Sequence, residues 1–190
     1  MKIKNVLFTL AIGVISTSSF AQDNNTDAHN VSVTIPEVAL LDLEASSGTS
    51  ISLAPTAPTE AGLAADFSTA RDNSIWINYS SIVGSTTEPS RNVSVQITSG
   101  ALPSGVALRV TPSTDAGQGE GTMGAVGTSA ITLGTTAQNV VTGIGSAYTG
   151  DGVAKGHNLV YKLDQLPGAF GRLDFDQSST LVISYTLSDN

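Results

Sequence analysis

Two histidines, His29 and His157, are the side chains of this sequence best suited to proton transfer near neutral pH. His29 lies in a polar lead-in that offers no rigid scaffold. His157 precedes an alternating segment, where a hydrolase could pair it with one of the many serines and an aspartate. The sequence contains no G-x-S-x-G elbow and no H-E-x-x-H motif. We therefore predict that the chain is not an enzyme, with a hydrolase that uses His157 as the alternative.

Acidic pairs are the next candidates, because calcium prefers carboxylate and carbonyl oxygens as ligands. Asp174 and Asp176 stand two residues apart, and Asp115 and Glu120 flank a glycine-rich stretch. Neither pair has the spacing of an EF-hand loop, so we predict no cofactor, with calcium as the alternative. The sequence has no cysteine, which excludes thiolate ligands for zinc or iron–sulfur clusters.

A glycine motif and a single tryptophan could each contact a ligand. Residues 119–124 (GEGTMG) match G-x-G-x-x-G, but no helical pattern follows them, as a dinucleotide site requires. We interpret this stretch as a glycine-rich loop. Trp76 lies between Ile75 and Ile77 in an expected strand, so one of the two faces of that strand must be in the core. We expect Trp76 to pack in the core or under a loop. The alternative is an exposed platform, which makes Trp76 the candidate ligand contact.

Charge restricts the partners of the chain. Eight basic and sixteen acidic residues give a formal net charge of −8, and removal of Lys2 and Lys4 with a leader would leave −10. The remaining six cations form no run that could neutralise a phosphate backbone. We therefore expect no nucleic-acid partner, while the acidity itself favours solubility.

The first 21 residues have the three-part pattern of a signal peptide. Lys2 and Lys4 precede an apolar run over residues 6–15, and small residues continue to Ala21, where cleavage would occur. The run is too short to span a bilayer as a permanent helix. We expect a bacterial protein that is exported to the periplasm, to the cell surface or a fimbrium, or into the medium, with no integral membrane segment in the mature chain.

Period-two alternation dominates the rest of the sequence. Residues 22–28 are predicted to be a flexible polar leader, and residues 29–190 a single domain. Strands are expected at 31–35, 38–44, 49–54, 75–80, 93–97, 106–110, 130–133, 138–142, 158–163, 173–175 and 180–187. Eleven glycines between residues 115 and 156 indicate loops and weak hairpins. Many short strands without an amphipathic helix predict an all-β fold, a single antiparallel β-sandwich of Ig-like or pilin-like type with a glycine-rich loop region.

The first alternating run could act within one molecule or between molecules. Val31, Val33 and Ile35 share one face, and Pro36 ends the run. Each of these side chains would contribute about 1.5–3 kcal/mol if fully buried, as an upper bound. The run could be an ordinary first strand of its own sheet, or it could add to the sheet of a neighbour. Val31, Val33 and Ile35 are thus the candidate strand-donor face.

The exported, Ser-, Thr- and Gly-rich sequence, with this N-terminal run and the closing residues TLVISYTLSDN, resembles bacterial fimbrial subunits and related pilin-like sandwiches. The resemblance lies in the general organisation of residues 22–190, and the disulfide common in that family has no counterpart here. It implies assembly by donation of residues 29–35 to the incomplete sheet of the next subunit. We expect a structural or adhesive protein, including a pilus or fibre subunit, whose partners are its own copies or other cell-surface subunits. The alternative is a monomeric secreted module that binds a glycan or small ligand through Trp76 and the 115–156 loops.

Overall fold

The computed structural model describes residues 25–190, so the predicted signal peptide at residues 1–21 lies outside the described part of the chain. Residues 25–34 form one unit and residues 35–190 another, and each is considered by itself. The second unit contains eleven strands and one short 3-10 helix. These are β1 (Val38–Ala45), β2 (Arg71–Ile82), β3 (Arg91–Ser99), β4 (Val106–Asp115), β5 (Glu120–Gly121), β6 (Ala125–Val126), β7 (Ile131–Thr132), β8 (Gln138–Ile144), β9 (Ala147–Tyr148), β10 (His157–Gln165), η1 (Phe170–Arg172) and β11 (Val182–Asp189).

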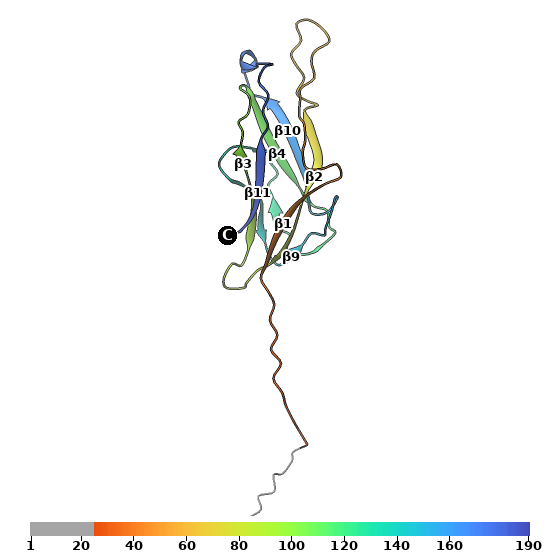
Figure 1. Cartoon of the computed structure of the whole chain (residues 1–190), viewed down its shortest axis with the longest axis vertical. Helices are drawn as coiled ribbons and strands as arrows, with labels where there is room; N and C mark the ends of the chain where they lie inside the picture. Colours follow the sequence, from red (N-terminus) through yellow and green to blue (C-terminus); the bar gives the residue numbers. More distant parts are fainter. Residues whose placement is uncertain (1–24) are drawn as a thin grey trace, which may run out of the picture. The chain divides into compact units, whose positions relative to one another are not determined.

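The strands form two antiparallel sheets that pack face to face (Figure 1). The larger sheet has seven strands, with β10 and β9 along one edge of β2 and β1 along the other. The smaller sheet has four strands in the order β11-β3-β8-β6. The predicted all-β, antiparallel sandwich is therefore confirmed.

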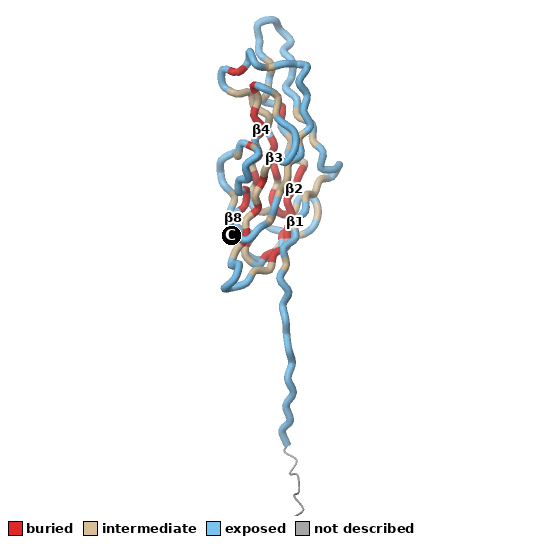
Figure 2. Tube along the Cα trace, turned by 60° about the vertical axis from the view of Figure 1, so that its left-hand side comes forward, coloured by how far each residue is buried: buried red, intermediate tan, exposed pale blue. Residues whose placement is uncertain are grey.

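Inward-facing side chains of the two sheets build one hydrophobic core. The larger sheet supplies residues of β2, β4 and β10, and the smaller sheet supplies residues of β3 and β8. The buried cluster comprises Ile75, Ile77, Tyr79, Val93, Val95, Ile97, Leu108, Val110, Leu133, Val140, Val141, Ile144, Leu159 and Tyr161. Figure 2 shows buried positions along β2, β3 and β4. In β3 they alternate regularly with less buried ones, as expected for a sheet with one face in the core.

One side of the sandwich is closed by a segment that passes from one sheet to the other. Residues 131–133 bind β4, with the Leu133 amide donating to the Leu108 carbonyl at 2.8 Å. The Ile97 amide of β3 then donates to the Gly134 carbonyl at 2.7 Å, and β8 continues along β3. Backbone hydrogen bonds therefore join the two sheets on this side.

Three predicted strands are not formed. Residues 31–35 belong to no strand, and the first strand begins at Val38, after Pro36. Residues 49–54 pack Ile51 and Leu53 against the core without strand pairing, so burial alone accounts for their alternation.

The expected strand at residues 173–175 is not formed, since these residues follow η1 and enter a turn. The Asp174 carboxylate accepts hydrogen bonds from the Asp176 amide at 3.0 Å and from the Gln177 side chain at 3.4 Å. Phe175, which lies within the expected strand, is 97% exposed. The short-range bonds of Asp174 favour the turn over an extended backbone.

No helix within residues 25–190 has both the length and the apolar character needed to cross a membrane.

Candidate functional site

The candidate donor face is exposed. Val31, Val33 and Ile35 are 73%, 82% and 74% exposed, although each is a β-branched apolar residue. Single exposed apolar side chains are common on protein surfaces. Three in strict alternation, within a segment that forms no strand, have the pattern of a strand with one apolar face.

The second feature is a pair of long edge strands that belong to different sheets. β1 pairs only with β2, and β11 pairs only with β3, so each has one unpaired edge. The two strands contact each other along one side of the sandwich. No backbone hydrogen bond joins them within the described residues. We call this boundary the β1–β11 seam.

Inward side chains along the seam are incompletely covered. Leu41, Leu43 and Ala45 of β1 pack against the core but are only partly buried. The same holds for Ile183, Tyr185 and Leu187 of β11. Here, unlike on the side closed by residues 131–144, no backbone hydrogen bond within residues 25–190 joins the two sheets. A long unpaired edge with apolar side chains beneath it is a template for an added strand.

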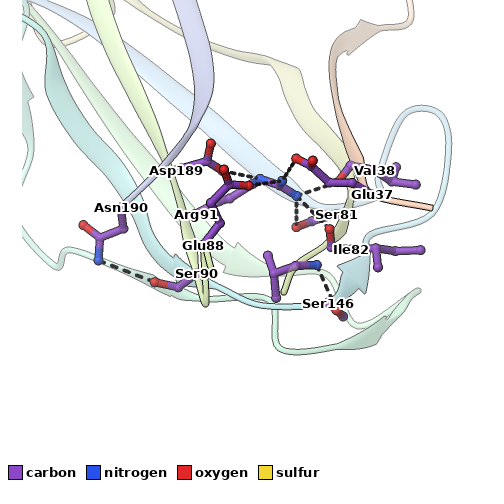
Figure 3. Close-up of polar contacts among 11 residues, drawn as sticks. Glu37, Val38, Ser81, Ile82, Glu88, Ser90, Arg91, Ser146, Asp189 and Asn190 are labelled. Carbon is purple, nitrogen blue, oxygen red and sulfur yellow. Dashed lines mark hydrogen bonds and ion pairs between the residues drawn. The ribbon is translucent and has the colours of Figure 1, made fainter. Parts of the chain in front are cut away.

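A buried arginine lies at one end of the seam (Figure 3). Arg91 opens β3 and its side chain is only 1% exposed. Its Nε donates to Asp189 Oδ1 of β11 at 2.8 Å, and its Nη1 donates to the Val38 carbonyl of β1 at 2.5 Å. Nη1 also donates to the Ile82 carbonyl at 3.1 Å, and Nη2 pairs with the Glu37 carboxylate. One guanidinium thus joins β3 to the ends of β1, β2 and β11.

Sequence reasoning missed Arg91, although a signal for it was present. Arg91 has the same parity as Val93, Val95 and Ile97, so the alternation of β3 places it on the core face. A cation on a core face requires acceptors nearby, because burial of an unpaired charge is very unfavourable. The carboxylates that supply them come from residues distant in sequence, except for Glu88, whose Oε2 lies 3.7 Å from Nη2. Their convergence could not be predicted without the strand order.

Two tyrosines connect the sheets beneath the seam. The hydroxyl of Tyr161 on β10 lies 2.7 Å from that of Tyr185 on β11. Burial raises the pKa of Tyr161 to about 12, and burial also raises the pKa of Tyr185 well above its usual range. Tyr79 in the core likewise has a raised pKa, chiefly because of burial and then because of the nearby Asp115 carboxylate.

These raised tyrosine pKa values predict a loss of stability in alkali. An unfolded tyrosine has a pKa of about 10, so unfolding at higher pH releases protons that the folded state retains. The stabilising contribution is complete below about pH 10 and falls as pH rises towards about 12. Denaturant unfolding between about pH 8 and about pH 12 should show this decline, and Tyr161→Phe should reduce its slope. Tyr148→Phe, at a half-exposed position, is the matched control, and an equal change in slope would contradict the assignment.

His157 is a core residue. It begins β10, is 1% exposed, and stacks on Tyr79 with ring centroids 5.7 Å apart. Its Nε2 lies 2.9 Å from the Tyr79 hydroxyl, and its Nδ1 lies 2.9 Å from the Ser113 carbonyl oxygen. The hydroxyl of the same serine, Ser113 Oγ, accepts from the Asn158 amide at 2.9 Å rather than facing the ring nitrogens. The buried ring therefore has partners on both nitrogens that hold it between strands.

The acidic pairs occupy different environments. Asp174 caps the turn described above, and Asp115 accepts a hydrogen bond from the Gly117 amide at 2.7 Å. Within the described residues, the one group of three carboxylates close enough to share a cation is Glu37, Glu88 and Asp189. Arg91 already occupies the centre of that group. Its guanidinium supplies the positive charge that a metal ion would otherwise bring to these carboxylates.

Trp76 lies on the outer face of the larger sheet and is partly exposed. Its cross-strand neighbours are Glu44 and Asn158. Two shallow grooves on this face are instead lined by Leu40, Ser80 and Tyr148, among others, and neither includes Trp76. Trp76 as a ligand contact therefore stays a prediction.

The G-x-G-x-x-G match has a packing explanation. No helix follows it, since Glu120–Gly121 is β5 and the chain continues into β6. A Cβ on Gly119 would lie 1.6 Å from the Tyr148 carbonyl oxygen, so a side chain cannot fit there. Gly119 is thus required by the close approach of two backbones.

Searches against protein-family models and against curated proteins found no match to this chain.

Proposed function

We propose that this protein is a subunit of an exported bacterial fibre or adhesive assembly that self-associates by β-strand addition. Residues 29–35 of one copy would enter the β1–β11 seam of the next. The observation that carries the proposal is the exposed alternation of Val31, Val33 and Ile35 outside any strand. The β1–β11 seam, whose apolar side chains are only partly buried, is the acceptor that the same fold offers.

The donor segment and the acceptor match in length and in pattern. Residues 29–35 span seven residues, and β11 has eight. An added strand would gain backbone hydrogen bonds to an unpaired edge, while alternate side chains enter the space beneath it. Val31, Val33 and Ile35 would then complete the cover over Leu43, Tyr185 and their neighbours. Ser32 and Thr34 would face solvent.

The free energy gained by apolar burial and strand pairing favours association. Burial of three apolar side chains contributes up to about 5–9 kcal/mol in total. Strand pairing adds hydrogen bonds of about 0.5–1.5 kcal/mol each. These gains oppose the loss of translational freedom and the ordering of the segment. A contact between different surfaces of identical copies repeats without closing, and therefore favours filaments.

The mature chain, residues 22–190, tests the proposal through its mass in solution and its appearance in electron microscopy. We expect a mass that increases with concentration, and filaments at high concentration. A synthetic peptide of residues 28–36 should occupy the seam and shorten the filaments. The control peptide carries serine at positions 31, 33 and 35 and should have no effect. A chain that stays monomeric at high concentration and binds neither peptide would overturn the proposal.

A further inference from the structure

The donor segment is adjacent in sequence to one wall of the seam. Only Pro36 and Glu37 separate residue 35 from Val38, where β1 begins. A chain could therefore fill its own seam by folding residues 29–35 back against β1 as a hairpin. Such a chain would be a self-completed monomer. The proposed function requires that this hairpin be disfavoured, and the inference below rests on that function.

Pro36 disfavours the shortest such hairpin. A fold-back that paired residue 35 with Val38 would have Pro36 and Glu37 as the two central turn residues. Two-residue hairpins use type I′ or II′ turns, and both need positive φ at the first central position. Proline fixes φ near −65°, so it cannot occupy that position.

Arg91 opposes the longer alternatives. A wider turn would have to recruit Glu37 and Val38 and change their backbone path. Arg91 binds both of these residues, through the Glu37 carboxylate and the Val38 carbonyl. The guanidinium is itself buried and is held by Asp189 of β11 and by the Ile82 carbonyl of β2. Release of Glu37 and Val38 would remove two acceptors from a desolvated cation, which is strongly unfavourable.

We infer that Pro36 and the Arg91–Glu37 pair form a specificity device that directs residues 29–35 to the seam of a second copy. Arg91 is a positioning residue, since it acts on the donor segment through Glu37 and Val38. Its contact with Asp189 also fixes the end of the acceptor strand. The same guanidinium therefore holds both the residues that follow the donor segment and the end of the acceptor strand within each copy.

The test replaces the turn in the full mature chain by Pro36→Asn together with Glu37→Gly. Asn-Gly is the preferred type I′ pair, and the change also removes one Arg91 partner. We expect a monomer at concentrations where the wild type assembles. The amides of residues 31–35 should exchange about 100-fold more slowly than in the wild-type monomer, because they become paired within the chain. Glu88→Gln is the control, since Glu88 is the most distant carboxylate partner of Arg91 and lies outside the segment.

The outcomes separate this inference from the proposed function. Assembly of the Pro36→Asn, Glu37→Gly chain at the wild-type concentration, with unprotected amides in its monomer, would overturn the specificity device and leave strand addition intact. A wild-type monomer whose residues 31–35 are already protected at every concentration would overturn both. A wild-type chain that neither assembles nor protects these amides would overturn strand addition and, with it, the specificity device.

Discussion

Val33→Asp will keep the mature chain monomeric at concentrations where the wild type assembles. Val33 is the central residue of the donor face, so its side chain would enter the seam between Val31 and Ile35. The substitution removes about 1.5–3 kcal/mol of apolar burial and would place a carboxylate in an apolar environment. We expect the concentration needed for assembly to rise by about 100-fold or more, equivalent to about 2.7 kcal/mol.

The monomer itself should be unaffected by this substitution. Val33 is 82% exposed, and surface substitutions usually change the free energy of unfolding by less than about 0.5 kcal/mol. Thr34→Asp is the matched control, because it adds the same charge to the opposite face of the segment. Sedimentation at a series of concentrations would compare the three chains. Equal assembly of the Val33→Asp and wild-type chains would show that this face is not buried on association.

Arg91→Ala should destabilise the folded domain by about 3 kcal/mol or more. The Val38 and Ile82 carbonyls would lose a charged donor, and the ends of β1, β2 and β11 would lose their common partner. A cavity at a position that is 1% exposed adds to the cost. Arg91→Lys should recover only part of the stability, because an ammonium cannot reproduce the planar fork of the guanidinium.

Urea unfolding in the Val33→Asp background would measure this effect without a contribution from assembly. Arg109→Ala is the control, since Arg109 is 44% exposed and its nitrogen lies 3.6 Å from the Asp164 carboxylate. Exposed ion pairs contribute about 1 kcal/mol at most. A loss below about 1 kcal/mol for Arg91→Ala would mean that the buried cluster does not hold the strand ends together.

The alternation of apolar and polar residues predicted the fold class, because each of the two sheets has one face in the core and one face in solvent. Val93, Val95 and Ile97 show this pattern, and β3 lies where they indicate. The runs at 49–54 and 173–175 failed for different reasons. Ile51 and Leu53 are partly buried without a strand partner, and the Asp174 carboxylate favours a turn over a strand. In the run at 49–54, the period-two pattern therefore reports which side chains pack against the core, but not whether the backbone is paired.

The alternation of the candidate donor face could be read from the sequence, whereas the β1–β11 seam that is proposed to accept it could not. Val31, Val33 and Ile35 are consecutive alternate residues, so a local pattern identifies them. The seam depends on β1 and β11, which are separated by most of the domain and belong to different sheets. Arg91 is a second example. The alternation of β3 places its side chain on the core face, but its partners Glu37 and Asp189 are brought together only by the strand order. Contacts between residues of distant strands can be assigned only when the strand order is known.

The segment at 131–144 has a consequence for the proposed assembly as a polymer. It joins the two sheets by backbone hydrogen bonds on one side, whereas no such bond joins β1 to β11 among the described residues. Under the proposed strand addition, each copy would have a valence of two, with one end that gives a strand and one that receives it. Bivalent units of this kind grow as unbranched linear chains with a defined polarity, and a single seam-filling peptide terminates each chain.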